Sequence, residues 1–306
     1  MSLKNLTREI VLGYLSALAA TAIWSGNFIV ARGLNDAIPP VSLAFCRWFV
    51  ATAALFPFAL KNLIAEWPEI KKHPGYFCIT SFLGITTFNT LIYFAGHTTT
   101  ALNLSLIAIT FPIFILIFSR IIYKEPLTLV KIVGIVLVLC GVVILITKGR
   151  LSILLTISFN TGDIWMLAAS LIFAVYTLFL KKKPDSVSVR GMQLSTFSLG
   201  LIFLTPFFVW EYSLVQDPFL NRTTIPAILY VGIFASLCSF ILWNKAVIAL
   251  GSSRAGMVYY TIPLFSGVLG FFFLKENISF MHLYSLILIL TGIIIANHET
   301  REISEQ

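Results

Sequence analysis

Charged residues are scarce in this sequence of 306 residues: 11% are Asp, Glu, Lys or Arg, whereas 58% are hydrophobic. Soluble domains carry about 25% charged residues, because a surface in water needs charge, so this composition excludes an ordinary water-soluble globule. The 27 Phe, 10 Tyr and 6 Trp exclude a disordered chain. The net charge of +8 does not indicate a nucleic-acid partner, since basic residues that flank membrane helices produce the same excess.

Residues that build metal, disulfide and catalytic sites are also few and scattered. The four cysteines show no C-x-x-C spacing, which gives no support to zinc binding or to disulfides. The four aspartates lie far apart, so no magnesium cluster is expected, and the four histidines do not group. We therefore expect no cofactor and no enzymatic activity, and a membrane enzyme or a scaffold stays open as an alternative function.

What the sequence has in abundance is long apolar runs separated by short polar breaks. A helix needs about 20 apolar residues to cross a bilayer. The first run follows Lys4 and Arg8, as in a signal peptide, but it extends to Ala31, which favours a membrane span. We predict an all-α integral membrane protein with ten transmembrane helices, at 10–32, 40–61, 75–96, 99–120, 127–147, 161–180, 190–210, 225–249, 253–274 and 279–297.

Lys and Arg are distributed unevenly between alternate breaks. If the N-terminus lies inside, thirteen of them fall on the inner side and five on the outer side. The most basic stretch is Lys181–Arg190. Because positive charge accumulates in cytoplasmic loops, both termini are predicted to be cytoplasmic, in a multi-pass protein of the inner or plasma membrane.

The second half of the sequence repeats the first. With a shift of 151 residues, 95–146 aligns with 246–297 without a gap. Each half, 1–150 and 151–306, then holds five predicted spans. Because five is odd, the second half enters the membrane from the opposite side, as in transporters that work by alternating access. The least common matches are Pro112 with Pro263, expected to kink and hinge their helices, and Lys124-Glu125 with Lys275-Glu276.

Short motifs add to this pattern. They are Trp24-Ser25-Gly26-Asn27-Phe28, Phe45-Cys46-Arg47-Trp48, and two copies of Ala-x16-Pro followed by Lys-Glu, at Ala95–Glu125 and Ala246–Glu276. In these motifs the sequence resembles the drug/metabolite transporter superfamily, and within it the EamA-type exporters and permeases. The resemblance implies ten helices as two inverted five-helix repeats, and transport of small metabolites such as amino acids through a central cavity. One departure is Phe173, where such proteins often have Trp.

Polar and aromatic side chains inside the apolar runs are the candidates for a substrate site. A charge is costly in a bilayer, so Arg47 indicates either an anchor for a substrate carboxylate or a structural arginine bonded to helix carbonyls. Lys245 lies near a span end, where a lysine can snorkel. Asn can instead join helices, and Trp and Tyr can form interface belts. The expected substrate-binding residues are Trp24, Asn27, Arg47, Asn89, Tyr93, Tyr176, Trp243, Asn244 and Tyr260.

Acidic residues are missing from the middle of every predicted span. Glu125 and Glu276 follow spans and are interpreted as helix-terminal structure rather than as a gate. The basic cavity favours neutral, zwitterionic or anionic substrates, with amino acid export first. Exchange of nucleotide sugars or phosphorylated metabolites would need more buried Lys and Arg, and a quaternary amine would need an aromatic cage. The expected partners are a small-molecule substrate and membrane lipid, without nucleic acid, for a monomer or a homodimer.

Overall fold

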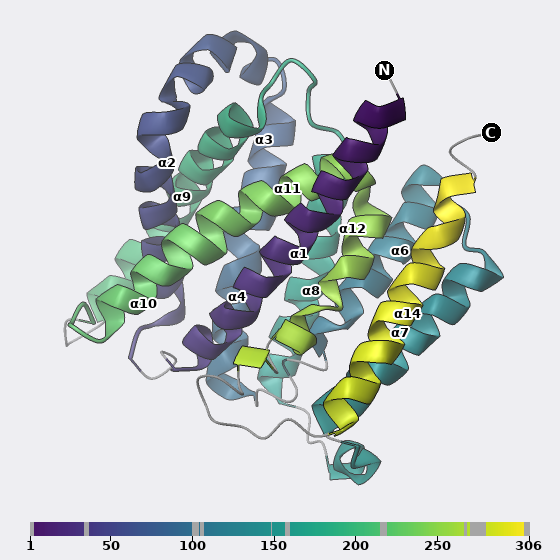
Figure 1. The fold of residues 1–306 in the computed structure, drawn as a ribbon. Helices are drawn as coiled ribbons and strands as arrows, with labels where there is room; N and C mark the ends of the chain where they lie inside the picture. The colour runs from purple at the N-terminus through teal and green to yellow at the C-terminus, as the bar shows by residue number, and fades with distance from the viewer. Residues whose placement is uncertain are drawn as a thin grey trace.

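The chain, described here from a computed structural model, folds into a bundle of helices (Figure 1). The structure describes residues 3–33, 37–99, 104, 107–147, 149–156, 160–214, 219–265, 268–269 and 280–302, and these contain no β-strand. The elements are α1 Leu3–Gly33, α2 Pro40–Ile70, α3 Pro74–Ser81, η1 Phe82–Thr87, α4 Phe88–Thr98, α6 Thr110–Tyr123, α7 Leu129–Thr147, η2 Leu151–Thr156, α8 Thr161–Leu180, α9 Val189–Leu214, α10 Thr224–Tyr230, η3 Val231–Cys238, α11 Ser239–Leu250, α12 Ser252–Tyr259 and α14 Phe280–Glu302.

Several of these helices are membrane spans by length and composition. Two shorter apolar helices, Thr110–Tyr123 and Leu283–Asn297, lie at the predicted fourth and tenth spans. The predicted ninth span, 253–274, begins with α12, while Lys275 and Glu276 lie outside the described residues. The all-helical architecture is confirmed, and the count of ten spans stays a prediction. The seven stretches that qualify as spans are Arg8–Asn27, Pro40–Ile70, Pro74–Thr98, Leu129–Thr147, Thr161–Leu180, Val189–Leu214 and Thr224–Leu250.

The helices are interrupted at positions that recur in both halves. A turn at Ile109 precedes α6, and a turn at Tyr260 follows α12, exactly three residues before Pro112 and Pro263 in each case. Proline lacks an N–H and its ring clashes with the carbonyl four residues earlier, so the α-helix cannot run through these points. The π-helical segments η1 and η3 interrupt the predicted third and eighth spans, again about 151 residues apart. Hinge motion at the prolines stays a prediction.

Helices of one half pack on helices of the other half, and these contacts come in corresponding pairs. The partner of α1 is α11, and in the other half the partner of α8 is α4. In the same way α2 packs on η3, and α9 packs on η1. Two further pairs join the halves directly, α2 with α9 and α7 with α14, which Figure 1 shows side by side. The first helix begins and the last one ends at the same end of the bundle (Figure 1).

Glutamates lie at both ends of the pair formed by α2 and α9. Glu211, near the end of α9, accepts hydrogen bonds from the backbone N–H groups of Val41 and Ser42 at 3.1 and 2.6 Å, at the start of α2. Glu66, near the end of α2, lies against Gly191 in the first turn of α9. Carboxylates are favourable at helix N-termini, where unpaired N–H groups and the helix dipole present positive charge. The two glutamates therefore favour this antiparallel arrangement.

The pair formed by α7 and α14 lies at one side of the bundle (Figure 1) and depends on glycine. A Cβ atom on Gly134 would lie 2.7 Å from the backbone oxygen of Gly292, and one on Gly292 would lie 2.6 Å from that of Gly134. Small residues allow helix backbones to approach closely in membranes, where van der Waals packing drives association. Any larger side chain at this crossing must push the two helices apart.

Candidate functional site

Arg47 is the centre of the candidate site. It lies on α2 and is completely buried. Its Nε donates a hydrogen bond to Ser236 Oγ at 2.6 Å, and its Nη1 donates to Asn89 Oδ1 at 2.8 Å and to Tyr93 OH at 2.6 Å. Asn89 and Tyr93 are four residues apart on α4, which places them on one face of that helix. The predicted residues Arg47, Asn89 and Tyr93 therefore form one group, bound through side chains rather than through helix carbonyls.

Two hydrogen-bond donors of this group have no acceptor among the described residues. Within the part of the chain that the structure describes, Arg47 Nη2 and Asn89 Nδ2 have no acceptor, and the partners of the guanidinium are all neutral. A buried charge without a counter-ion costs several kcal/mol, and buried N–H groups are normally paired. The unpaired donors lie next to a fixed positive charge, which is the arrangement that binds a carboxylate.

Ser236 was missed by the sequence analysis, and it belongs to the π-helical segment η3. Its hydroxyl donates to the carbonyl of Val231, five residues earlier, at 2.8 Å and accepts the Nε–H of Arg47. Extra backbone carbonyls become available where a helix widens to five-residue spacing, and such bulges are frequent at functional sites. The bulge thereby sets the position of the serine facing α2.

Aromatic rings fill the middle of the bundle beside this group. Trp24 is the hub: its ring centroid lies 5.3 Å from that of Trp243 and 5.6 Å from that of Phe173. Its Nε1 donates to the carbonyl of Ala235 at 2.9 Å. Among the described residues these rings touch one another in the middle of the bundle, where the resemblance implied a central cavity. We call this set the aromatic cluster; its members are Trp24, Phe111, Phe173, Phe240, Trp243 and Tyr259, all buried.

Two predicted residues lie at the edge of the aromatic cluster. Tyr176 stacks on Phe173 with centroids 5.6 Å apart and donates to Asn244 Oδ1 at 3.2 Å. Asn244 Nδ2 and Asn27 Oδ1 are buried and have no partner among the described residues. Burial of Tyr176 removes the interface-belt interpretation for this residue, as it does for Tyr93.

Tyr260 and Lys245 lie outside both the Arg47 group and the aromatic cluster. Tyr260 packs with Leu116, Val138 and Ile289 next to α7 and α14, in an apolar group separate from the one that contains the aromatic cluster. Its neighbour Tyr259, rather than Tyr260, belongs to the aromatic cluster, and substrate binding by Tyr260 stays a prediction. Lys245 is exposed on the outside of the bundle, as the snorkelling interpretation requires.

A second polar group joins three elements at the end of the bundle where α6 and α8 finish and α12 begins. Lys181 Nζ donates to Glu125 Oε1 at 2.7 Å, and Ser253 Oγ donates to the other carboxylate oxygen. Burial raises the pKa of Glu125, but the hydrogen bonds from Lys181 and Ser253 outweigh it and hold that pKa below its ordinary value. Glu125 was interpreted as helix-terminal structure, whereas its carboxylate links α8 to α12. The matching Glu276 lies outside the described residues.

Comparison with known proteins identifies the chain's family. The sequence profile of the EamA-like transporter family matches residues 11–147 and again residues 160–298. The chain belongs to the EamA-like transporter family. It is a multi-pass membrane protein, and the predicted resemblance is confirmed. Among the described residues no group of three His, Cys, Asp or Glu is placed to hold a metal ion.

Relatives of this EamA-like transporter are described as transporters. An uncharacterized transporter of Archaeoglobus fulgidus is 26% identical over 278 residues, covering 89% of this chain and 92% of that protein. Another from Methanothermobacter thermautotrophicus is 28% identical over 301 residues, covering 92% and 85%. The uncharacterized transporter YetK of Bacillus subtilis is 24% identical over 283 residues. A solved crystal structure shares the fold with a TM-score of 0.71 at 18% identity, covering 95% of this chain and 98% of that one.

Proposed function

We propose that this transporter moves small metabolites that carry a carboxylate, with amino acids as the first candidates, out of the cell across the cytoplasmic membrane. The observation that carries the proposal is the buried Arg47, whose Nη2 lacks an acceptor in the described part of the chain beside the free Nδ2 of Asn89. A carboxylate would receive charge-assisted hydrogen bonds from both groups and would supply the missing negative charge. Tyr93 and Ser236 hold the guanidinium in place for it.

The rest of an amino acid would meet the aromatic cluster and the free amide groups. Asn27 Oδ1 is a buried acceptor that finds no donor among the described residues, which suits an ammonium group. The rings around Trp24 offer an apolar and polarisable surface for a side chain. Because such rings also attract cations, the aromatic cluster favours quaternary amines as a second candidate substrate.

Transport would proceed by alternating access between two inverted five-helix repeats, 1–150 and 151–306. Three observations support this architecture: the family profile matches the chain twice, the helix interruptions recur 151 residues apart, and the pair of α1 with α11 corresponds to the pair of α8 with α4. Glu125 links the end of α8 to the start of α12 at one end of the bundle, and this link would open and close during the cycle. The turns at Ile109 and Tyr260 would be the hinges.

Matched ligands and matched variants test the carboxylate assignment. Amino acids that bind the folded protein raise its Tm, so phenylalanine and phenethylamine, which lacks the carboxylate, are compared on the purified protein. We expect phenylalanine to bind at least about 30-fold more weakly to Arg47→Gln than to the wild type, because losing one partner of a buried charge pair costs about 2 kcal/mol or more. Lys245→Gln, which removes an exposed cation outside the Arg47 group, should leave binding unchanged.

Three results would count against this assignment. If the amine stabilises the protein as strongly as the amino acid, Arg47 does not recognise a carboxylate. If only quaternary amines stabilise it, the aromatic cluster is the recognition element. If only phosphorylated compounds do, the amino acid assignment is wrong. Tyr93→Phe, which keeps the ring and removes only the hydroxyl that binds Arg47, should weaken amino acid binding in the same direction and guards against a folding defect in Arg47→Gln.

A further inference from the structure

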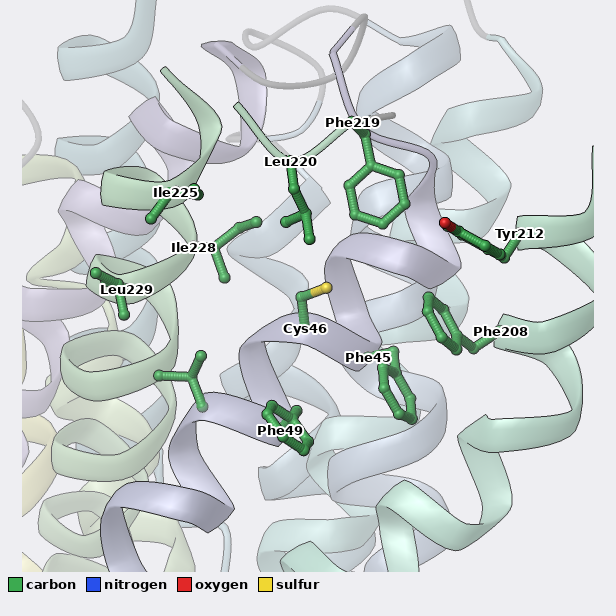
Figure 2. A pocket seen from close by; sticks show the side chains of 11 residues that line it. Phe45, Cys46, Phe49, Phe208, Tyr212, Phe219, Leu220, Ile225, Ile228 and Leu229 are labelled. Atoms are coloured by element: carbon green, nitrogen blue, oxygen red, sulfur yellow. The ribbon is translucent and has the colours of Figure 1, made fainter. Parts of the chain in front are cut away.

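An apolar groove of about 460 Å³ opens on the side of the bundle, away from the aromatic cluster. It is walled by α2, by the end of α9, and by the segment that leads into α10. Its floor is aromatic: the rings of Phe45 and Phe208 stack with centroids 4.1 Å apart. Figure 2 shows Cys46 in the middle, between Leu220 and Phe208. The lining residues are Phe45, Cys46, Phe49, Val50, Phe208, Tyr212, Phe219, Leu220, Ile225, Ile228 and Leu229.

The groove faces outward from the bundle. Five of its large side chains are 44–58% exposed, and four of them, all except Leu220, belong to candidate membrane spans. An empty apolar hollow loses van der Waals contacts on one side, and lipid chains are the apolar molecules that surround these helices. The volume falls in the range of pockets that hold small ligands. The chemistry of the lining therefore selects a hydrocarbon chain.

One end of the groove carries a positive charge. Arg222 lies in the turn between Leu220 and Ile225, both of which line the groove, and it is exposed. The turn is held in place because Asn221 Oδ1 accepts hydrogen bonds from the backbone N–H groups of Thr223 and Thr224 at 2.9 and 3.0 Å. The carboxylate of Glu211, at the same end, is already bound to the start of α2. Arg222 is thus placed for a phosphate where membrane headgroups lie.

The groove also borders the substrate site. Its α10 wall continues directly into η3, where a Cβ atom on Gly232 would lie 2.6 Å from Val50, a lining residue of α2. The same segment contains Ser236, whose hydroxyl oxygen accepts the hydrogen bond from Arg47 Nε. A chain in the groove would therefore support the wall that holds the Arg47 group.

We propose that the groove binds one acyl chain of an anionic phospholipid, whose phosphate is held by Arg222. None of its lining residues belongs to the Arg47 group or to the aromatic cluster proposed for the metabolite. A lipid bound here stabilises the contact between α2 and the α10–η3 wall.

Lipid retention by the purified full-length protein tests the proposal. The protein is reconstituted with equal amounts of phosphatidylglycerol and phosphatidylcholine, extracted, and analysed by native mass spectrometry. We expect about fivefold preferential retention of one phosphatidylglycerol, the effect of one basic residue at the membrane surface. Arg222→Gln should lose the preference, and Arg150→Gln, which changes another exposed arginine, should keep it. The role of Arg222 is overturned if both variants keep the preference for phosphatidylglycerol, or if both variants lose it.

A second pair of variants tests the groove itself. Leu229→Trp fills it, while Ile202→Trp adds the same ring to a 63% exposed position of α9 outside the lining. We expect only Leu229→Trp to lose the bound phospholipid and its stabilising shift in Tm. Equal retention by the two variants overturns the proposal. Stabilisation by oleate equal to that by phosphatidylglycerol would also overturn it, because the occupant would then be a free fatty acid.

Discussion

Removing the carboxylate of Glu125 should open the end of the bundle that it closes. In Glu125→Gln, the ion pair with Lys181 at 2.7 Å is lost, together with the charge that Ser253 binds. The gross Coulomb attraction at that distance is about 6 kcal/mol for an effective dielectric constant of 20. Both side chains are about a quarter exposed, at 26% and 25%, so desolvation and screening cancel most of it. A net effect of about 1–2 kcal/mol remains, which corresponds to a five- to 30-fold shift in population.

The opening can be measured by thiol labelling. Ser252 is fully buried beside Ser253, so a cysteine placed there reports whether α12 has separated from α8. In a background without the four native cysteines, a water-soluble maleimide should label Ser252→Cys about five- to 30-fold faster when Glu125→Gln is added. Glu69→Gln is the matched control, because its ion pair with Lys72 has a similar length of 2.8 Å but does not join separate helices.

The pH dependence gives an independent check. The pKa of Glu125 is lowered in the folded protein from its ordinary value of 4.5. Its contribution to stability is therefore complete above pH 4.5 and is lost as the pH falls through the lowered pKa. The Tm of the wild type should approach that of Glu125→Gln only in acid. Equal labelling rates of Ser252→Cys at pH 7 with and without Glu125→Gln would refute a closing role for this carboxylate.

Three further variants test separate features. Trp24→Ala removes the hub of the aromatic cluster, costing about 3–5 kcal/mol if the cavity stays open, and should abolish uptake into proteoliposomes; normal uptake would exclude the cluster from the pathway. Gly292→Ala should lower Tm because its Cβ meets the backbone of α7, whereas Gly96→Ala has open space and should not; equal Tm values would contradict the close crossing. Glu211→Gln should destabilise the protein by about 1 kcal/mol in thermal unfolding through loss of the carboxylate at the α2 N-terminus, and an unchanged Tm would argue against that role.

Local patterns predicted the Arg47 group better than they predicted the aromatic cluster. The spacing of Asn89 and Tyr93 on one helix and the rarity of charge in a span are properties of short segments, and both led to residues that now meet. Ser236 and Phe240 give no comparable signal, because serine and phenylalanine are common in apolar helices and their roles depend on contacts with distant helices. The helix widens at η3 because its backbone hydrogen bonding changes, and no residue type in this segment predicts that change.

The choice between Tyr259 and Tyr260 shows the same limit. Adjacent residues on a helix point about 100° apart, and here the helix also turns at Tyr260, so the sequence could not decide which ring faces the bundle centre. The role of Glu125 was missed for a related reason: its partners Lys181 and Ser253 lie 56 and 128 residues away. The span positions and the family, by contrast, depend on the apolar runs and the short motifs, which the sequence shows directly.

The neutral surroundings of Arg47 have an electrical consequence for the proposed cycle. With no carboxylate among its described partners, the empty site carries one positive charge inside the bilayer. A bound carboxylate without an ammonium group would cancel that charge, whereas a zwitterionic amino acid would leave it in place. One elementary charge crossing the whole field is worth about 2.3 kcal/mol per 100 mV. Membrane voltage would then act alike on the empty carrier and on the carrier loaded with an amino acid, and it would have little effect only when the substrate is an anion. A negative interior would draw the empty site toward the cytoplasm, where an exporter collects its substrate.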